Sequence, residues 1–114
     1  MVIISYPTCC FQTNTFQCVL VSDGSLSFVI FLYADEEIQW TTGDYSGGVG
    51  GLGGIPAQVG FNAGDHVRSA SIPESQTEAI INITKTSNIG VPGVWIFQVN
   101  EKEIATGGIN GVCT

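Results

Sequence analysis

Hydrophobic and polar positions form their clearest pattern in the first third of the chain. Two apolar runs, Phe16–Val21 and Leu26–Tyr33, are rich in β-branched and aromatic residues, and a polar segment with the pair Asp23-Gly24 separates them. An Asp-Gly pair between such runs predicts a β-hairpin, because the turn needs residues that tolerate positive φ. The second run is apolar on both of its faces, which predicts a central strand that is buried on both sides.

The rest of the chain predicts further short strands. After an acidic turn, Ile38–Thr41 is expected to return as the third strand of a meander, and His66–Gln76 is expected to be a polar connection anchored by Ile72. Thr77 and Glu78 are typical of the start of a helical turn, but the alternation that follows favours a strand. The remaining predicted strands are Val2–Tyr6, Ala57–Asn62, Ile80–Lys85, Val94–Val99 and a short Ile104–Ala105.

Strands at about ten-residue spacing, separated by Gly and Asn turns, predict an all-β fold. The expected architecture is an antiparallel β-sandwich with at most one short helical turn. Residues 46–54 contain six glycines and are expected to form a glycine-rich loop. We expect one domain over residues 1–106 and a C-terminal tail or linker over residues 107–114.

Charge and composition limit the classes of function. The chain has 114 residues, 11% of them charged, and a net charge of −7. Its three basic residues, Arg68, Lys85 and Lys102, form no cluster, which argues against nucleic acid and against anionic membranes. No apolar run approaches the ~20 residues that span a bilayer, and the first seven residues do not have the pattern of a signal peptide. Sparse charge and four cysteines favour an extracellular protein, secreted or at the cell surface.

Three blocks of sequence, in this order, resemble the NIDO domain, the extracellular module of nidogen that is also found in tectorin-like and mucin-4-like surface proteins. They are NTFQCVLVSDGSLSFVIFLYADEEIQWTTGDYSGG, GLGGIPAQVGFNAGD and TSNIGVPGVWIFQV. The resemblance covers roughly Tyr6 to Val99. It implies a matrix or adhesion module without a catalytic centre. The chain departs from the family pattern at Cys18, where the family has a small apolar residue, and at the pair Cys9-Cys10.

The four cysteines, Cys9, Cys10, Cys18 and Cys113, allow three pairings. We expect Cys18 to bond Cys9 or Cys10, and the other one to pair with Cys113 or with a neighbouring module or chain. The spacing of the cysteines is not that of a metal site, so structural disulfides are favoured.

Asn82-Ile83-Thr84 is a sequon for N-glycosylation, and the alternation of its neighbours places Asn82 toward solvent. We therefore predict a glycan at Asn82.

Residues of the kinds used in catalysis and metal binding are present but not arranged for either. Gly43-Asp44-Tyr45-Ser46-Gly47-Gly48 is similar to the nucleophile segment of trypsin-like proteases, but Tyr45 displaces the serine from the glycine amides of an oxyanion hole. Nothing in the sequence links His66 to Ser46. Acidic side chains that could bind calcium have no EF-hand spacing and are expected to form a solvated face: Asp35, Glu36, Glu37, Asp44 and Asp65. We therefore predict no enzyme, no metal and no cofactor.

Aromatic residues offer a second class of function. Trp40 and Trp95 are expected to lie in strands as core or half-buried anchors, whereas Tyr45 is expected at the mouth of the loop. A candidate ligand or partner loop consists of Asp44, Tyr45, Asn62 and Asp65.

The leading prediction is a structural or adhesion module that acts by contact with other matrix or cell-surface proteins. Exposed strand edges favour self-assembly into polymers or filaments as a variant of this function. The alternative is a lectin-like carbohydrate-binding module.

Overall fold

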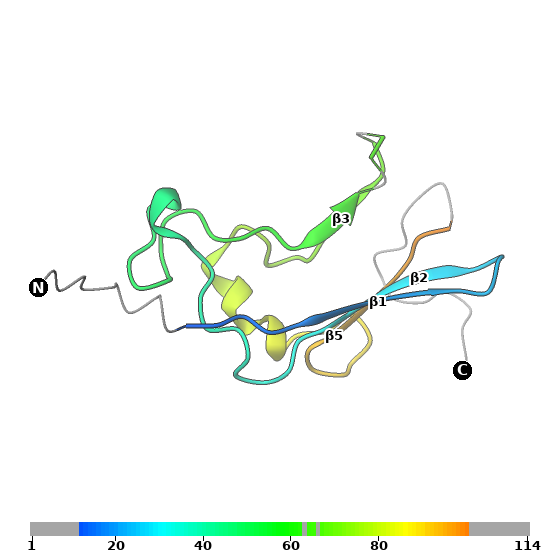
Figure 1. Ribbon diagram of the computed structural model, residues 1–114, viewed down its shortest axis with the longest axis horizontal. Helices are drawn as coiled ribbons and strands as arrows, with labels where there is room; N and C mark the ends of the chain where they lie inside the picture. The colour runs from blue at the N-terminus through cyan, green and yellow to red at the C-terminus, as the bar shows by residue number, and fades with distance from the viewer. Residues whose placement is uncertain (1–11, 63, 66, 101–114) are drawn as a thin grey trace, which may run out of the picture.

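The chain folds into two antiparallel sheets joined by loops and short 3-10 segments (Figure 1). The computed structural model describes residues 12–62, 64–65 and 67–100. Strands β1, β2 and β5 form the larger sheet, in the order β1-β2-β5, and β3 and β4 form the smaller one. The elements are β1 Gln17–Ser22, β2 Ser27–Leu32, η2 Asp44–Ser46, β3 Gly60–Asn62, β4 Ser69–Ser71, η3 Glu78–Thr84 and β5 Val94–Gln98. The predicted all-β antiparallel class is confirmed, and its helical content consists of 3-10 segments.

The predicted hairpin is the pair β1–β2, and the Asp23-Gly24 turn closes it. Gly24 has a φ of +91°. The Asp23 carboxylate accepts hydrogen bonds from the backbone N–H groups of Ser25 (2.8 Å) and Leu26 (2.7 Å). These bonds, the one from Leu26 first, hold the pKa of Asp23 below its ordinary value. The turn therefore fixes the register Gln17↔Leu32 through Ser22↔Ser27.

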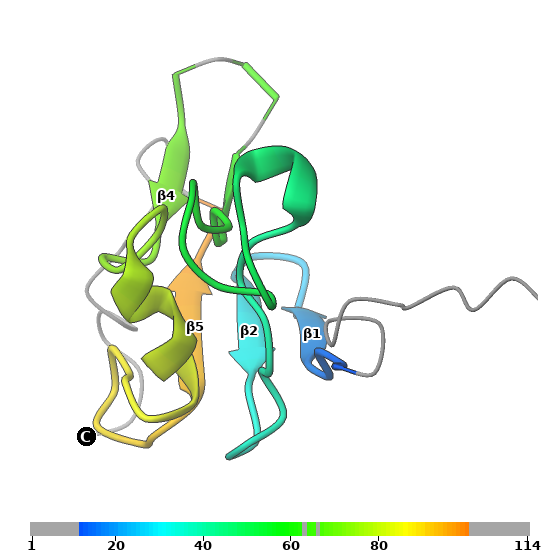
Figure 2. The ribbon, with the colours of Figure 1, turned by 90° about the vertical axis from the view of Figure 1, so that its left-hand side faces the viewer.

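The third strand of the sheet is β5, and the prediction of a meander through Ile38–Thr41 was wrong. Strand β2 pairs with β1 on one edge and with β5 on the other, which leaves no edge for a third local strand (Figure 2). Ile38 instead makes an isolated bridge with Asn14. The Asn14 side chain accepts from the N–H groups of Gln39 and Trp40, which holds this segment against the residues that precede β1.

One face of the larger sheet forms the core. Its buried side chains pack against Ile72, Ile80 and Ile83, which come from the segment after β4 and from η3. The core residues from the sheet are Val29, Phe31, Tyr33, Trp95 and Phe97. On the opposite face of β2, the side chains of Phe28, Ile30 and Leu32 are only half-buried. The expectation that β2 is buried on both sides was therefore wrong.

Segment η3 replaces the strand that was favoured at Ile80–Lys85. Thr77 precedes it in an extended conformation, as the alternative of a helical turn required. A 3-10 helix has three residues per turn, so Ile80 and Ile83 lie on one face, and both are buried against the core. A strand would instead place Ile81 and Ile83 on one face. The burial of Ile80 with Ile83 therefore favours the 3-10 conformation.

The smaller sheet differs from the sequence prediction in both of its strands, because β3 is shorter than expected and β4 was not expected at all. Of the expected strand Ala57–Asn62, only β3 at Gly60–Asn62 forms, and it pairs with β4 inside the segment expected to be a connection. Ile72 anchors that segment as predicted, and its side chain is buried. Several predictions fall outside the described residues, namely the strands Val2–Tyr6 and Ile104–Ala105, the residue His66, and the tail 107–114.

Candidate functional site

The strongest candidate for a functional surface is the outer face of the larger sheet. Residues directly opposite each other in antiparallel strands point to the same side of a sheet, so the register defines three rows on this face. The rows are Val21–Phe28–Gln98, Val19–Ile30–Ile96 and Gln17–Leu32–Val94. We call these nine residues the outer face. They include no charged side chain.

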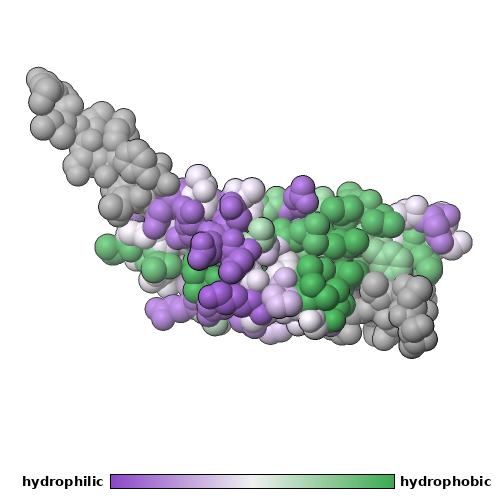
Figure 3. Space-filling model, turned by 90° about the horizontal axis from the view of Figure 1, so that it is seen from below, coloured by the Kyte–Doolittle hydropathy of each residue, from purple (hydrophilic) through white to green (hydrophobic). Residues whose placement is uncertain are grey.

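The outer face is apolar and accessible. Val19 and Val21 are exposed, and Phe28, Ile30, Leu32, Val94 and Ile96 are half-buried. Figure 3 shows apolar side chains gathered at the end of the molecule that carries this sheet. The elements that cover the sheet, η3 and the segment after β4, pack on its other side. Exposed apolar patches of this kind mark interaction sites in soluble proteins.

Cys18 lies on the inner side of β1, in register with Phe31. Its side chain is exposed, and it forms no disulfide within the described part of the chain. Cys9, Cys10 and Cys113 lie outside the described residues. The disulfide pairing therefore stays a prediction.

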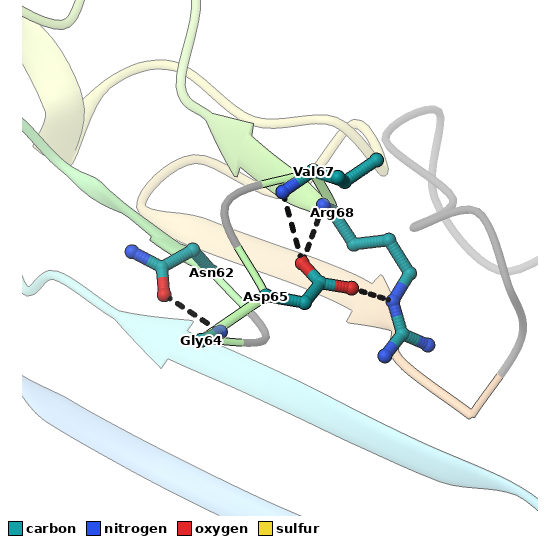
Figure 4. Close-up of polar contacts among 5 residues, drawn as sticks. All are labelled: Asn62, Gly64, Asp65, Val67 and Arg68. Atoms are coloured by element: carbon teal, nitrogen blue, oxygen red, sulfur yellow. Dashed lines mark hydrogen bonds and ion pairs between the residues drawn. The ribbon is translucent and has the colours of Figure 1, made fainter.

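Asp65, one member of the candidate ligand loop, is committed to contacts within its own turn (Figure 4). Its carboxylate accepts from the backbone N–H groups of Val67 (3.0 Å) and Arg68 (2.8 Å), and its other oxygen lies 2.6 Å from Arg68 Nε. These contacts with Arg68, and then the Val67 N–H, hold the pKa of Asp65 well below its ordinary value. Asn62 likewise accepts from the Gly64 N–H. Sequence reasoning missed the role of Arg68, although its spacing of three residues from Asp65 could have indicated it.

Asp44 and Tyr45 belong to η2, which lies far from the tip of β3 that carries Asn62 (Figure 1). The structure therefore does not bring the four candidate residues together. Tyr45 is fully exposed and lines an apolar hollow of about 220 Å³ with Trp40, Thr42 and Gly43. Trp95 is buried as predicted, but Trp40 lies outside the strands and is exposed.

Asn82 lies in η3 with an exposed side chain, whereas the sequon residue Thr84 is buried. The predicted solvent exposure is confirmed, although a 3-10 segment rather than a strand provides it. The glycan itself stays a prediction, which a mass loss on treatment with peptide N-glycosidase would test.

Acidic side chains that were considered for calcium are exposed: Asp35, Glu36, Glu37, Asp44 and Asp65. Within residues 12–62, 64–65 and 67–100, no group of three or more His, Cys, Asp or Glu side chains is placed to hold a metal ion. Across the same part of the chain, no helix has the length and hydropathy to cross a membrane.

The stability of the protein is expected to fall at alkaline pH because of Tyr33. Burial, and after it the electrostatic effect of Cys18, raises the pKa of Tyr33 to about 12. The folded-state pKa lies above the unfolded value of about 10. The contribution of neutral Tyr33 to the free energy of unfolding is therefore complete below pH 10 and is lost as the pH rises to 12. We expect the free energy of unfolding to fall by about 2 kcal/mol more in the wild type than in Tyr33→Phe between pH 9 and pH 11.5. Urea unfolding at pH 9 and pH 11.5 would measure this difference. An equal loss of unfolding free energy in the two proteins between these pH values would contradict the prediction.

Comparison with known proteins identifies the relatives of the chain. The model of the nidogen-like domain matches residues 5–101. Alpha-tectorin of Mus musculus is 55% identical over 93 residues, which cover 80% of this chain and 4% of alpha-tectorin. Nidogen of Drosophila melanogaster is 40% identical over 77% of this chain and 6% of its own length, and Nidogen-1 of Rattus norvegicus is 36% identical over 84% of this chain and 31% of the matched sequence.

The chain therefore spans about 4% of the length of alpha-tectorin from Mus musculus, Homo sapiens and Gallus gallus. No solved structure matches it. The chain is accordingly an extracellular module.

Proposed function

Because the chain belongs to the nidogen-like domain family, we propose that it is a non-catalytic structural and adhesion module. It acts by protein–protein contact with other matrix or cell-surface proteins, and it also associates with copies of itself. The observation that carries this proposal is the outer face of the larger sheet.

Two such faces are suited to pack against each other. Sheets pack face to face at about 10 Å when apolar side chains interdigitate between them. The chain carries a net charge of −7, which opposes association of copies in general. The outer face contributes none of that charge, so contact through it keeps the acidic residues apart.

The test is the mass of the protein in solution as its concentration rises. We expect the wild type to form dimers or larger species, and Ile30→Lys to weaken this association by about tenfold or more, because a charge in the central row would have to be desolvated. Val67→Lys is the matched control, since it adds the same charge at an exposed position in the turn after β3. We expect Val67→Lys to associate like the wild type.

A wild type that stays monomeric at millimolar concentration would contradict self-association. Equal association by Ile30→Lys and the wild type would show that copies meet elsewhere. Amide protection in β2 and β5 would confirm that the variant is folded.

Carbohydrate binding is the second candidate, and the hollow between Trp40 and Tyr45 favours it over the Asp65 turn. Aromatic faces beside an acceptor such as Asp44 are typical of sugar sites. Binding to a glycan array that Tyr45→Ala abolishes would support this function, and an array without binding would exclude the glycans tested.

A further inference from the structure

A hollow of about 560 Å³ lies between the turn that follows β4 and the segment that precedes β5. Glu74 contributes to one wall of this hollow, and Ser87 and Asn88 contribute to the other. The side chains of Trp95 and Phe97, which are buried, form its floor. Both belong to the core side of the larger sheet, so the hollow is separate from the outer face.

Two buried polar atoms at this hollow have no hydrogen-bond partner within the described part of the chain. One is Nε1 of Trp95, a residue that is 4% exposed, and the other is Oε2 of Glu74. Buried polar groups in folded proteins are nearly always hydrogen-bonded, because an unpaired one costs free energy. Both residues line the same hollow, so a ligand bound there would meet a donor and an acceptor that the fold leaves unused.

The two walls are held in place by bonds that do not involve these atoms. The Ser75 hydroxyl donates to the Val59 carbonyl (2.7 Å) and accepts from the Val59 N–H (2.9 Å), which anchors the turn that carries Glu74. On the other wall, the Asn88 side chain donates to the Ile96 carbonyl (2.7 Å) and accepts from the Ile96 N–H (3.0 Å). A ligand therefore meets a site whose walls are already ordered, which lowers the entropic cost of binding.

The two unused atoms select the chemistry of the ligand. An indole N–H can only donate a hydrogen bond, and a carboxylate can only accept one. An ammonium or guanidinium group has no acceptor for Trp95, and an anionic group has no donor for Glu74 and would be repelled by it. A neutral group that both donates and accepts satisfies the two atoms together, and hydroxyl and amide groups have this property.

The surroundings of the hollow favour hydroxyl groups of a small molecule over the amides of a peptide. An extended peptide would bind by adding a strand to the neighbouring β5 edge. The side chains of Ser87 and Asn88 already bond to the backbone of that edge, at Val94 and Ile96. The volume of the hollow falls in the range of small-molecule sites, about 300–1,000 Å³.

We propose that this hollow binds a neutral sugar residue, whose neighbouring hydroxyl groups accept from the Trp95 Nε1–H and donate to Glu74 Oε2. The site is distinct from the hollow between Trp40 and Tyr45 and does not depend on association between copies of the chain.

The indole N–H resonance of Trp95 reports directly on this site. The chain has two tryptophans, and Trp40 lies outside the hollow, so its indole N–H is an internal control. The probes are the methyl glycosides of glucose, galactose and mannose and N-acetylglucosamine, each added to dilute protein at up to about 100 mM, which saturates a site of low-millimolar affinity. We expect at least one of them to shift the Trp95 resonance while that of Trp40 stays in place.

Glu74→Ala removes the acceptor and should weaken this binding by about tenfold or more. Glu78→Ala is the matched control, because it removes the same charge from an exposed position in η3, outside the hollow. We expect Glu78→Ala to bind like the wild type. Amide protection in β2 and β5 would confirm that both variants are folded.

Four results would overturn the proposal. The first is a Trp95 resonance that none of the sugars moves. The second is a shift of the Trp40 resonance alone, which would place sugar binding at the hollow between Trp40 and Tyr45. The third is a response of Trp95 to N-methylacetamide but to no sugar, which would assign the hollow to a peptide. The fourth is equal binding by Glu74→Ala and the wild type.

Discussion

Replacing Gly93 by alanine is expected to destabilise the protein by about 3 kcal/mol or more. Gly93 has a φ of +77°, and a Cβ atom there would collide with the backbone carbonyl oxygen of Tyr33. The same residue accepts from the Tyr33 N–H and donates to the Thr86 carbonyl, so it joins the end of β2 to the segment after η3. Moving it would disturb both bonds at once.

Gly90→Ala is the matched control for this prediction. Gly90 has a φ of +79°, and a Cβ atom there would meet no other atom within 4 Å. Only the backbone cost of about 1–2 kcal/mol should therefore appear. Urea unfolding of both variants measures the difference, and equal losses of stability would show that the contact with Tyr33 does not exist.

Phe97→Ala is expected to cost about 3–5 kcal/mol of unfolding free energy, because it removes the centre of the core. The Phe97 side chain is 1% exposed, and its ring lies 5.1 Å from the ring of Phe61 and 6.1 Å from that of Phe31, both in edge contact. It links the larger sheet to β3.

Tyr45→Ala removes an aromatic ring of similar size from a fully exposed position and should change stability by less than about 0.5 kcal/mol. Thermal or urea unfolding compares the two. A loss below about 1 kcal/mol for Phe97→Ala would mean that Phe97 is not in the core.

Local signals in the sequence were enough to predict the strands of the larger sheet. The runs that became β1, β2 and β5 are five or more residues of apolar, β-branched and aromatic side chains, and the Asp23-Gly24 turn defines the hairpin between two of them. The partner of β2 was not predictable in this way. Strand β5 lies more than 60 residues after β2 in the chain, and nothing local distinguishes it from Ile38–Thr41.

Two further errors have clear physical causes. The run Ile80–Thr84 carries isoleucines at spacings of one, two and three, so strand and 3-10 periods fit it about equally, and contact with the core decides between them. Strand β4 consists of Ser69–Ser71, whose small side chains give no strand signal; its pairing with β3 defines it.

The exposure of the outer face could not be predicted from the sequence. Residues on both faces of β2 are apolar, which predicted burial on both sides, but composition does not reveal whether a second layer covers a face. An uncovered apolar face and a buried one have the same sequence pattern. The candidate loop was grouped for the chemistry of its members, and the fold separates Asp44 and Tyr45 from Asn62 and Asp65.

The most direct test of the proposal that the outer face is the contact surface is a dilution series followed by amide chemical shifts. We predict that the resonances of Phe28, Ile30, Leu32 and Ile96 move as the protein is concentrated, while those of η2 and the Asp65 turn stay fixed. Shifts confined to Cys18 and Leu20 at the β1 edge, or no shifts at any concentration, would contradict the account.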